Sequence, residues 1–478
     1  MVDLRYNVEE QYQTIRHFGA SGCWTLDPIG VEWSEANLQK LARLLFSVEE
    51  GIGLSNWRFN IGAGSVYIDK FEDSWRLSEC FRRSDSAPYD WTCHSGQQWF
   101  LNAAKRYNVP HFAAFTNSPP IWLTKNGRGC CDAASVSTNL RDGTQGEFAR
   151  FLVDVLQHFA EVGIVFDTIE PINEPSWAWE GTQEGCRYNN DDIKAVLRAL
   201  YAALSVSGLP THISAPDTGD LTVLLDDDVF TIWSGGDQFA KGPGPGNYRN
   251  SIREFLGDPE IAPMLGGHIA AHSYWTDEGD RNLTALRRAV RENLSAVAPD
   301  AEYWMTEYCV MQPGRDIGMA TALRMARTIH HDMVDGNASS WQWWLAVSPH
   351  DYKDGLIYTN YRETGQQDII PSCLLWVLGN YSRYVRPGAV RVSAALHHSP
   401  ETVMVSSYIN MDGALAIVLT NDGSADVAIS IPASQGYTTM TVALTDEAHA
   451  LVESGRQALP AAITLPLRSV TTLLLKQN

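Results

Sequence analysis

Strand-like and helix-like segments alternate along residues 15–380, and this alternation limits the possible folds more than any other feature. Short apolar stretches that end in Gly, Pro or Asn turns are typical of buried strands. Each is followed by apolar residues at helical spacing, most clearly Phe148, Phe151, Val155 and Phe159. Eight such units predict a parallel (β/α)8 barrel, and thus the α/β class. A doubly wound open sheet is the rival, but no Gly-rich dinucleotide or phosphate motif follows the first strand.

Composition changes after Pro387, where short alternating segments replace the helical spacing. Asp412-Gly413 and Asp422-Gly423 are typical hairpin turns between such segments. We therefore expect a β-sandwich over residues 387–478 and a catalytic barrel over residues 16–386. The N-terminal segment, residues 1–15, is expected to join the sandwich as an additional strand.

Two of the expected barrel strands lead into a glutamate. Residues 168–175 end in Asn173-Glu174-Pro175, and residues 303–308 contain Glu307. The strand count places Glu174 at the end of strand four and Glu307 at the end of strand seven. Pro175 favours an extended backbone at Glu174. Because barrel enzymes carry their catalytic groups at the C-terminal ends of the strands, we expect the two carboxylates to face one another across one pocket.

Two facing carboxylates indicate glycoside hydrolysis, in which one donates a proton and the other attacks the anomeric carbon. Glu174 lies among apolar and proline residues, which raise a carboxyl pKa and suit it to the role of acid. Arg58 on strand two and the Tyr274 hydroxyl on strand six are expected to keep Glu307 ionised as the nucleophile. The amide of Asn173 is suited to hold a sugar 2-hydroxyl. An ordinary structural ion pair is the alternative role for Arg58.

Further candidate substrate contacts are polar or aromatic residues near the expected strand ends. The chain has 16 tryptophans, whose rings serve either as core residues or as platforms for sugar rings. His272 is equally compatible with a core position and a ligand contact. The complete set of further candidates is Asn117, Trp122, Trp177, Trp179, Glu184, His272 and Trp343.

Charge and composition exclude several classes of partner. A net charge of −20 argues against nucleic acid and anionic membranes as partners. No apolar run of transmembrane length, metal-ligand cluster or nucleotide loop is visible, so we predict no membrane span, metal or cofactor. The N-terminus lacks the apolar core of a signal peptide, so the protein is either cytoplasmic or has lost a leader. The sequence does not indicate the oligomeric state.

The eight cysteines form no paired C-x-x-C zinc motif. Cys80 and Cys93 are candidates for a disulfide, and so is Cys186 with either Cys130 or Cys131. Free buried thiols are an equal alternative.

Seven short motifs are spread along the chain: Arg58-Phe59-Asn60-Ile61-Gly62, Ser118-Pro119-Pro120-Ile121-Trp122-Leu123, Asn173-Glu174-Pro175, His272-Ser273-Tyr274, Thr306-Glu307-Tyr308, Trp341-Gln342-Trp343-Trp344 and Arg468-Ser469-Val470-Thr471-Thr472. Taken together, these motifs resemble glycoside hydrolase family 30, among the (β/α)8 retaining glycosidases. The resemblance covers essentially the whole chain. It implies that Glu174 is the acid/base, that Glu307 is the nucleophile, and that Asn173, Arg58, Trp122, Tyr274 and Trp343 surround the reacting sugar.

Residues 173–186 are most similar to the endo-β-1,6-galactanases of that family. The resemblance implies that polar residues of this stretch bind the axial 4-hydroxyl of galactose. An exo-acting β-glycosidase, a β-1,6-glucanase and a xylanase are the alternatives within the family. A non-catalytic carbohydrate-binding protein is the alternative from another class.

Overall fold

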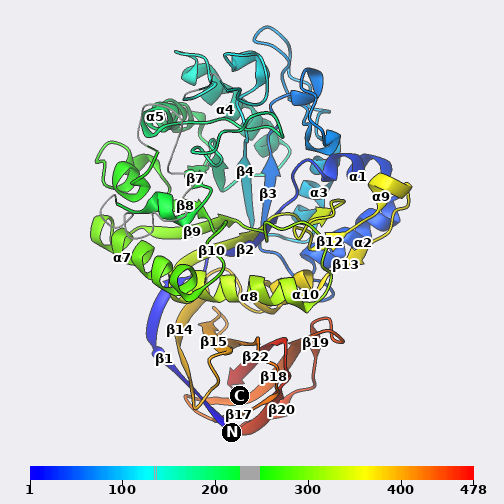
Figure 1. Ribbon diagram of the computed structural model, residues 1–478, viewed down its shortest axis with the longest axis vertical. Coiled ribbons are helices and arrows are strands. Elements are labelled where there is room, and N and C mark those ends of the chain that lie inside the picture. The colour runs from blue at the N-terminus through cyan, green and yellow to red at the C-terminus, as the bar shows by residue number, and fades with distance from the viewer. Residues whose placement is uncertain (134, 136, 227–247, 478) are drawn as a thin grey trace.

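The computed structural model describes residues 1–133, 135, 137–226 and 248–477, and it has two parts (Figure 1). A barrel of parallel strands surrounded by helices forms the larger part, and a β-sandwich lies beneath it in this view. The polypeptide begins and ends in the sandwich. This architecture confirms the predicted fold class.

The barrel sheet has the strand order β6-β5-β4-β3-β2-β10-β9-β8-β7. β6 and β7 are two pieces of one barrel strand, interrupted at Ser214 and Ala215. The Ser214 N–H donates to the Ile169 carbonyl, and the Ala215 carbonyl accepts from the Ala270 N–H, so this strand closes the barrel. The strands are β2 (His17–Ser21), β3 (Asn56–Asn60), β4 (His111–Phe115), β5 (Thr168–Glu170), β6 (His212–Ile213), β7 (Pro216–Thr218), β8 (His268–His272), β9 (Glu302–Glu307) and β10 (Ala338–Trp343).

Helices surround the barrel because each presents an apolar face to the strands. α5 (Asn190–Ser207) shows how the sequence sets both ends. The Asn189 side chain accepts from the Asp192 N–H, the Asp192 carboxylate accepts from the Asn189 N–H, and Gly208 ends the helix with a φ of 76°. The other helices are α1 (Leu26–Glu32), α2 (Glu35–Phe46), α3 (Ser95–Arg106), α4 (Gln145–Glu161), α7 (Arg287–Val297), α8 (Met319–Val334), α9 (Tyr361–Thr364) and α10 (Cys373–Ser382).

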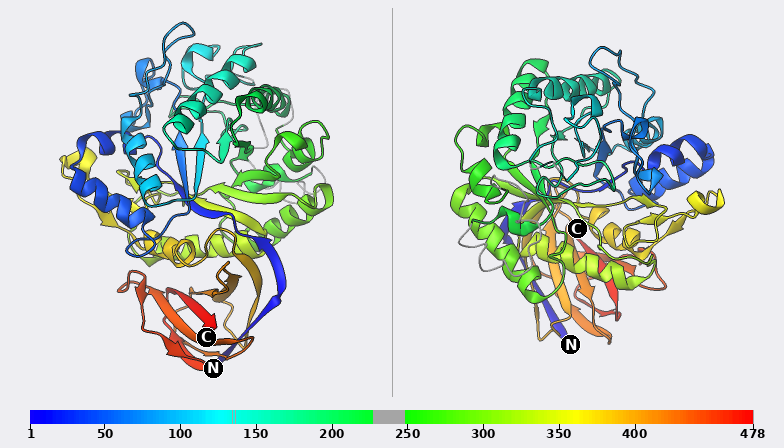
Figure 2. Two further views of the ribbon diagram at one scale, coloured as in Figure 1. Left: turned by 180° about the vertical axis from the view of Figure 1, so that it is seen from behind. Right: turned by 45° about the horizontal axis from the view of Figure 1, so that its top comes forward.

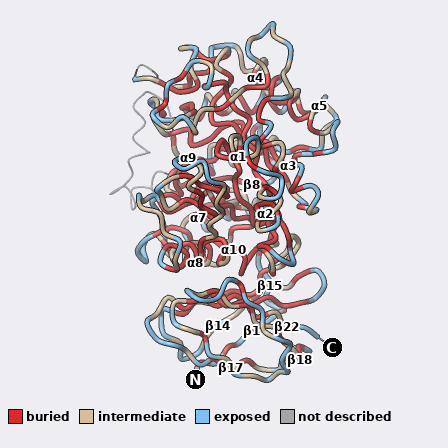
Figure 3. The backbone as a smooth tube through the Cα atoms, turned by 90° about the vertical axis from the view of Figure 1, so that its right-hand side faces the viewer, coloured by how far each residue is buried: buried red, intermediate tan, exposed pale blue. Residues whose placement is uncertain are grey.

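The sandwich is a curled sheet in which β1 (Val2–Thr14) pairs with β14 and β17. Figure 2 shows β1 running from the sandwich up to the barrel. The sandwich core is apolar and includes Leu4, Ile417 and Leu473 (Figure 3 shows the buried layers). Its other strands are β14 (Val390–His397), β15 (Val403–Ile409), β16 (Leu415–Asn421), β17 (Val427–Ile431), β18 (Tyr437–Thr445), β19 (Val452–Glu453), β20 (Gln457–Ala458), β21 (Ala461–Leu465) and β22 (Ser469–Gln477).

Helix α10 joins the two parts of the molecule. The Asn380 side-chain amide donates to the Ala443 carbonyl at 3.2 Å, and the Thr472 hydroxyl donates to the Asn380 carbonyl at 2.7 Å. All of these groups are buried, so the helix is held against the sandwich by hydrogen bonds that water does not reach.

The eight cysteines are thiols in this structure. The Cys93 thiol donates to the Cys80 carbonyl at 3.4 Å, and a hydrogen bond with the Cys186 thiol lowers the pKa of Cys131 to about 7. The two cysteine pairs considered from the sequence are therefore neighbours in the fold. Within the described ranges, none of the helices combines the length and apolar character needed to cross a membrane.

Candidate active site

Strand register brings the candidate residues to one end of the barrel. Arg58 lies opposite Ala113 in the β3–β4 pair, Phe115 lies opposite Glu170 in the β4–β5 pair, and His272 lies opposite Glu307 in the β8–β9 pair. Phe115, Glu170, His272 and Glu307 end their strands, at the face where barrel enzymes bind their substrates. Arg58 lies in the middle of β3, and its long side chain reaches Glu307 at that face. Side chains far apart in the sequence thus converge on one pocket.

The carboxylates of Glu174 and Glu307 lie close together. Ligand atoms of Glu174, His272 and Glu307 all lie within 4.8 Å of one another. The His272 Nδ1 atom is 3.1 Å from Glu174 Oε1 and 3.8 Å from Glu307 Oε1. A water molecule placed between the carboxylates, as an inverting hydrolase needs, requires a separation of about 6.5–9.5 Å.

Glu174 lies in a turn beyond β5 rather than in a strand. The prediction of an extended backbone at this position is wrong, because its φ is 44°, in the left-handed region. Its N–H donates to the Asp217 carbonyl at 2.8 Å, and its carbonyl accepts from Trp179 Nε1 at 3.0 Å. These bonds hold a strained backbone conformation that aims the side chain into the pocket. Burial raises the pKa of Glu174 to about 7, and the charge of Arg58 only partly offsets this effect.

Glu307 has the opposite kind of environment, with a cation and a hydroxyl group as partners. Arg58 Nη1 donates to Glu307 Oε2, and the Tyr274 hydroxyl donates to Glu307 Oε1 at 2.9 Å. Arg58 also donates through Nε to Glu170 at 2.6 Å. Burial lowers the pKa of Arg58, but the carboxylates of Glu170, Glu307 and Asp217 outweigh this effect and raise it. Arg58 therefore supplies a permanent positive charge beside Glu307.

His272 is a neutral contact of Glu174. Its side chain is fully buried, and burial lowers its pKa to about 4. Behind it, Asp217 Oδ1 lies 3.8 Å from His272 Nε2 and accepts from the Thr306 hydroxyl at 2.5 Å. Burial raises the pKa of Asp217 well above its ordinary value. Glu174 is therefore contacted from behind by an imidazole that is neutral at pH 7, and that imidazole adds no charge beside the carboxyl group.

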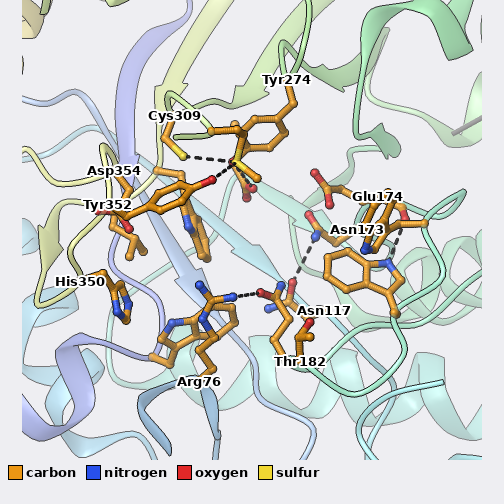
Figure 4. Close-up of a pocket in the computed structure, with 18 of the residues that line it drawn as sticks. Arg76, Asn117, Asn173, Glu174, Thr182, Tyr274, Cys309, His350, Tyr352 and Asp354 are labelled. Carbon is orange, nitrogen blue, oxygen red and sulfur yellow. Dashed lines mark hydrogen bonds between the residues drawn. The ribbon is translucent and has the colours of Figure 1, made fainter. Parts of the chain in front are cut away.

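The pocket next to these carboxylates has a volume of about 290 Å³. Asn173 lies in it with its side chain fixed, because Asn173 Nδ2 donates to Asn117 Oδ1 at 3.1 Å and Asn173 Oδ1 accepts from Arg58. Figure 4 shows Asn173 and Glu174 on one side of the pocket and His350, Tyr352 and Asp354 on the opposite side. The lining combines aromatic rings with hydrogen-bonding groups, as sugar recognition requires.

Three of the predicted contacts do not line this pocket. Trp122 Nε1 donates to the Arg82 carbonyl at 2.9 Å, and Trp343 is fully buried with Nε1 donating to the Asp354 carbonyl at 2.6 Å. Glu184 is also fully buried, and its carboxylate accepts from the N–H groups of Ala63 and Ser65. The structure therefore gives Trp343 and Glu184 buried supporting positions, whereas Trp122 is partly exposed but lies outside the lining of this pocket.

The remaining predicted residues line the pocket or support it. Asn117, Asn173, Trp177, Trp179 and Tyr274 line it together with the two glutamates, whereas Arg58 and His272 lie behind those glutamates. Sequence analysis missed Trp24, Arg76, Trp275, Trp344, His350, Tyr352 and Asp354, which also line it. Trp24, Trp275 and Trp344 had a detectable signal, since they are tryptophans one to three residues beyond the ends of β2, β8 and β10. Arg76 and the 350–354 group lie in loops without a motif.

Glu174, His272 and Glu307 are the one cluster of this kind in the described chain with donor atoms close enough to share a metal ion. Each of the three already has a protein partner: Arg58 and Tyr274 bind Glu307, and His272 contacts Glu174. The arrangement of one neutral and one ion-paired carboxyl matches a proton donor beside a nucleophile.

Fold and site together define a barrel glycoside hydrolase. The chain belongs to glycoside hydrolase family 30. The model described as "O-Glycosyl hydrolase family 30" matches residues 1–358, and "Glycosyl hydrolase family 30 beta sandwich domain" matches residues 388–473. These matches confirm the resemblance seen in the sequence.

Relatives whose activity is named are distant in sequence. The endo-beta-1,6-galactanase of Hypocrea rufa is 25% identical over 82% of this chain and 77% of its own. A conserved exported protein from Bacteroides fragilis superimposes with a TM-score of 0.86 at 30% identity, covering 99% of this chain and 100% of that one. The catalytic domain of xylanase C from Talaromyces cellulolyticus superimposes with a TM-score of 0.73 at 21% identity over 99% and 100% of the two chains, which shows the fold alone.

One expected result concerns Arg58. Replacement by methionine leaves Glu170 and Glu307 buried without their cation, so we expect the free energy of unfolding to fall by about 3–5 kcal/mol. Urea denaturation measures this change. Arg16→Met is the matched control, because its ion pair with Glu302 is partly exposed and is worth about 1 kcal/mol or less. Equal losses in the two variants would contradict the assignment of a buried charge cluster.

Proposed function

We propose that the protein is a retaining β-glycoside hydrolase whose substrate is β-1,6-linked galactan. The observation that carries the proposal is the approach of two carboxyl groups, whose nearest oxygen atoms lie within 4.8 Å, one group with its pKa raised to about 7 and the other held by a guanidinium group. Retaining hydrolases need this close spacing, near 5–5.5 Å between carboxyl groups, because the second carboxylate attacks the sugar directly.

The reaction proceeds in two displacements. In the first, a carboxylate oxygen of Glu307 bonds to the anomeric carbon while the bond to the leaving oxygen breaks, and Glu174 gives its proton to that oxygen. In the second, the ionised Glu174 takes a proton from water, whose oxygen bonds to the anomeric carbon and releases Glu307. Arg58 and Tyr274 hold Glu307 in the geometry of attack, and Asn173 is placed to bind the sugar 2-hydroxyl.

The stretch after β5 supports galactan as the substrate. Trp177, Trp179, Thr182 and Gln183 of residues 173–186 all line the pocket, and this is the stretch that resembles the β-1,6-galactanases. Their rings and polar side chains suit the two faces of galactose, whose axial 4-hydroxyl makes one face polar and leaves the other apolar. The relative from Hypocrea rufa adds support at the level of the whole chain.

Product analysis tests both parts of the proposal. The purified protein is incubated with β-1,6-galactan, β-1,6-glucan, xylan and a series of aryl β-glycosides, and products are separated by chromatography. We expect hydrolysis of galactan above the other glycans. Proton NMR in the first minutes is expected to show the β-anomer of the new reducing end before mutarotation. An initial α-anomer would overturn retention, and hydrolysis of another glycan alone would overturn the choice of galactan. Binding without hydrolysis would favour a carbohydrate-binding protein.

A further inference from the structure

Side chains from three loops join along the rim of the pocket. Arg76, in the loop after β3, donates through Nη1 to Gln183 Oε1 in the loop after β5, at 2.8 Å. The neighbouring Asp73 places Oδ2 3.3 Å from His350 Nδ1 in the loop after β10, and its Oδ1 lies 2.9 Å from Arg362 Nη1. Asp73 Oδ2 also lies 3.8 Å from Arg76 Nε, so Asp73 links the Arg76–Gln183 pair to His350. We call these four residues the bridged rim.

Two buried polar atoms beside the bridged rim lack a protein partner. Asp354 is 4% exposed, and its Oδ1 atom accepts no hydrogen bond; His350 Nε2 is likewise buried and unbonded. Both residues line the pocket. A buried carboxylate oxygen without a donor costs free energy unless a ligand supplies one. Hydroxyl groups of a sugar are donors and acceptors of the required kind.

The position of Glu174 indicates which side of the pocket binds the leaving part of the substrate and which side binds the attacked sugar. An acid that protonates the leaving oxygen must contact the bond that breaks, so the leaving part of the substrate lies on the Glu174 side. There the rings of Trp177 and Trp275 stack with centroids 6.2 Å apart, and Trp275 is 39% exposed. The sugar that Glu307 attacks then extends toward Asp354 and His350, which Figure 4 shows across the pocket from Glu174.

We propose that the protein cleaves at the non-reducing ends of its substrate and that the bridged rim, with Asp354 and His350, recognises the terminal sugar. This inference rests on the proposed function and departs from the internal mode of attack favoured from the sequence. A chain bound internally needs an open path on both sides of the bond, whereas the rim joins three loops that line the pocket, including the loop that carries His350 and Asp354. A pocket of about 290 Å³ also lies at the lower end of the usual range for ligand sites, about 300–1,000 Å³.

A pair of end-labelled substrates tests the inference. One is a β-1,6-linked galactotetraose with a fluorescent label at its reducing end, and the other carries in addition a 4,6-O-benzylidene acetal on its terminal galactose. We expect the free chain to give one labelled product of fixed size at early times. The capped chain is expected to react at least about 100-fold more slowly, because the hydroxyl groups that the pocket must bind are no longer donors. Labelled fragments of several sizes, or equal rates for the two chains, would overturn chain-end action.

The same experiment separates this inference from the proposed function. If galactan chains are inert but another glycan is hydrolysed, the free and capped pair is made from that glycan, and its product pattern decides the mode of attack. Hydrolysis that yields fragments from internal cleavage overturns chain-end action and leaves the proposed function intact. No hydrolysis of any member of the panel overturns the proposed function, and the inference with it.

A variant that breaks the bridged rim provides a second test of chain-end action. Arg76→Ala removes the hydrogen bond to Gln183, and we expect the rate on the capped chain relative to the free chain to rise by about tenfold, the scale of one lost steric or hydrogen-bond restriction. Arg83→Ala is the matched control, since Arg83 is an exposed arginine of the same loop that does not line the pocket. An unchanged rate ratio in Arg76→Ala would show that the rim does not set the mode of attack.

Discussion

Replacement of Glu307 by glycine is expected to lower kcat on galactan by a factor on the order of 10⁶, the scale seen when a covalent nucleophile is removed. The loss follows from the geometry, because Glu307 is the carboxylate that Arg58 and Tyr274 hold beside the reacting centre. The effect lies in the chemical step, so KM for galactan is expected to change far less than kcat. Initial rates of reducing-sugar release measure both constants.

Azide distinguishes a lost nucleophile from a misfolded protein. In Glu307→Gly the missing side chain leaves space on the α face of the sugar, where azide can attack an aryl β-glycoside that carries a good leaving group. We expect rescue with formation of the α-glycosyl azide, identified by NMR. Glu302→Gly is the control, because Glu302 begins the same strand at the opposite end of the barrel. Recovery without an azido-sugar, or loss of activity in both variants, would contradict the assignment.

The fold could be predicted because its signals are local and repeated. The apolar face of α4, with Phe148, Phe151 and Phe159 buried, is visible as helical spacing in the sequence. The sandwich was visible through its hairpin turns, such as Asp412-Gly413. The interruption of one barrel strand at Ser214 and Ala215 was not visible, because it depends on pairing with neighbours on both sides rather than on local spacing.

The meeting of the two glutamates with Arg58 and Tyr274 was predictable, because the proposed chemistry requires particular residues near strand ends. Glu174, Glu307, Arg58 and Tyr274 do meet in one place, as their strand positions implied. The backbone at Glu174 was not predictable, since its left-handed φ depends on the hydrogen bond to the Asp217 carbonyl. Local preference before a proline was overridden there by a tertiary contact.

The outer part of the pocket depends on loops, and this is where sequence reasoning fell short. Glu184 lies in the stretch that resembles galactanases, yet it folds inward to accept the N–H groups of Ala63 and Ser65. Asp354 belongs to no motif, yet its carboxylate faces the pocket. A polar residue in a loop can face a ligand or satisfy buried backbone groups, and only the path of the loop decides between them.

Loss of the acid has a different signature from loss of the nucleophile. Glu174→Gln keeps the shape of the side chain but cannot donate a proton, so we expect kcat/KM on galactan to fall by about 10²–10⁴-fold. An aryl β-glycoside with a dinitrophenyl leaving group needs no protonation, and its kcat/KM is expected to stay close to that of the wild type. Azide is expected to attack the glycosyl-enzyme and give the β-glycosyl azide, the opposite anomer from that of Glu307→Gly.

The pH profile makes this assignment specific to Glu174. Burial raises the pKa of Glu174 to about 7, so the wild-type kcat/KM on galactan is expected to fall above pH about 7, as the acid loses its proton, and to lose that limb in Glu174→Gln. Glu184→Gln is the matched control, because burial also raises the pKa of Glu184 to about 7, although Glu184 lies outside the pocket. If Glu184→Gln removes the alkaline limb while Glu174→Gln keeps it, the proton that reaches the leaving oxygen does not come from Glu174. The strained turn that presents Glu174 would then need another explanation.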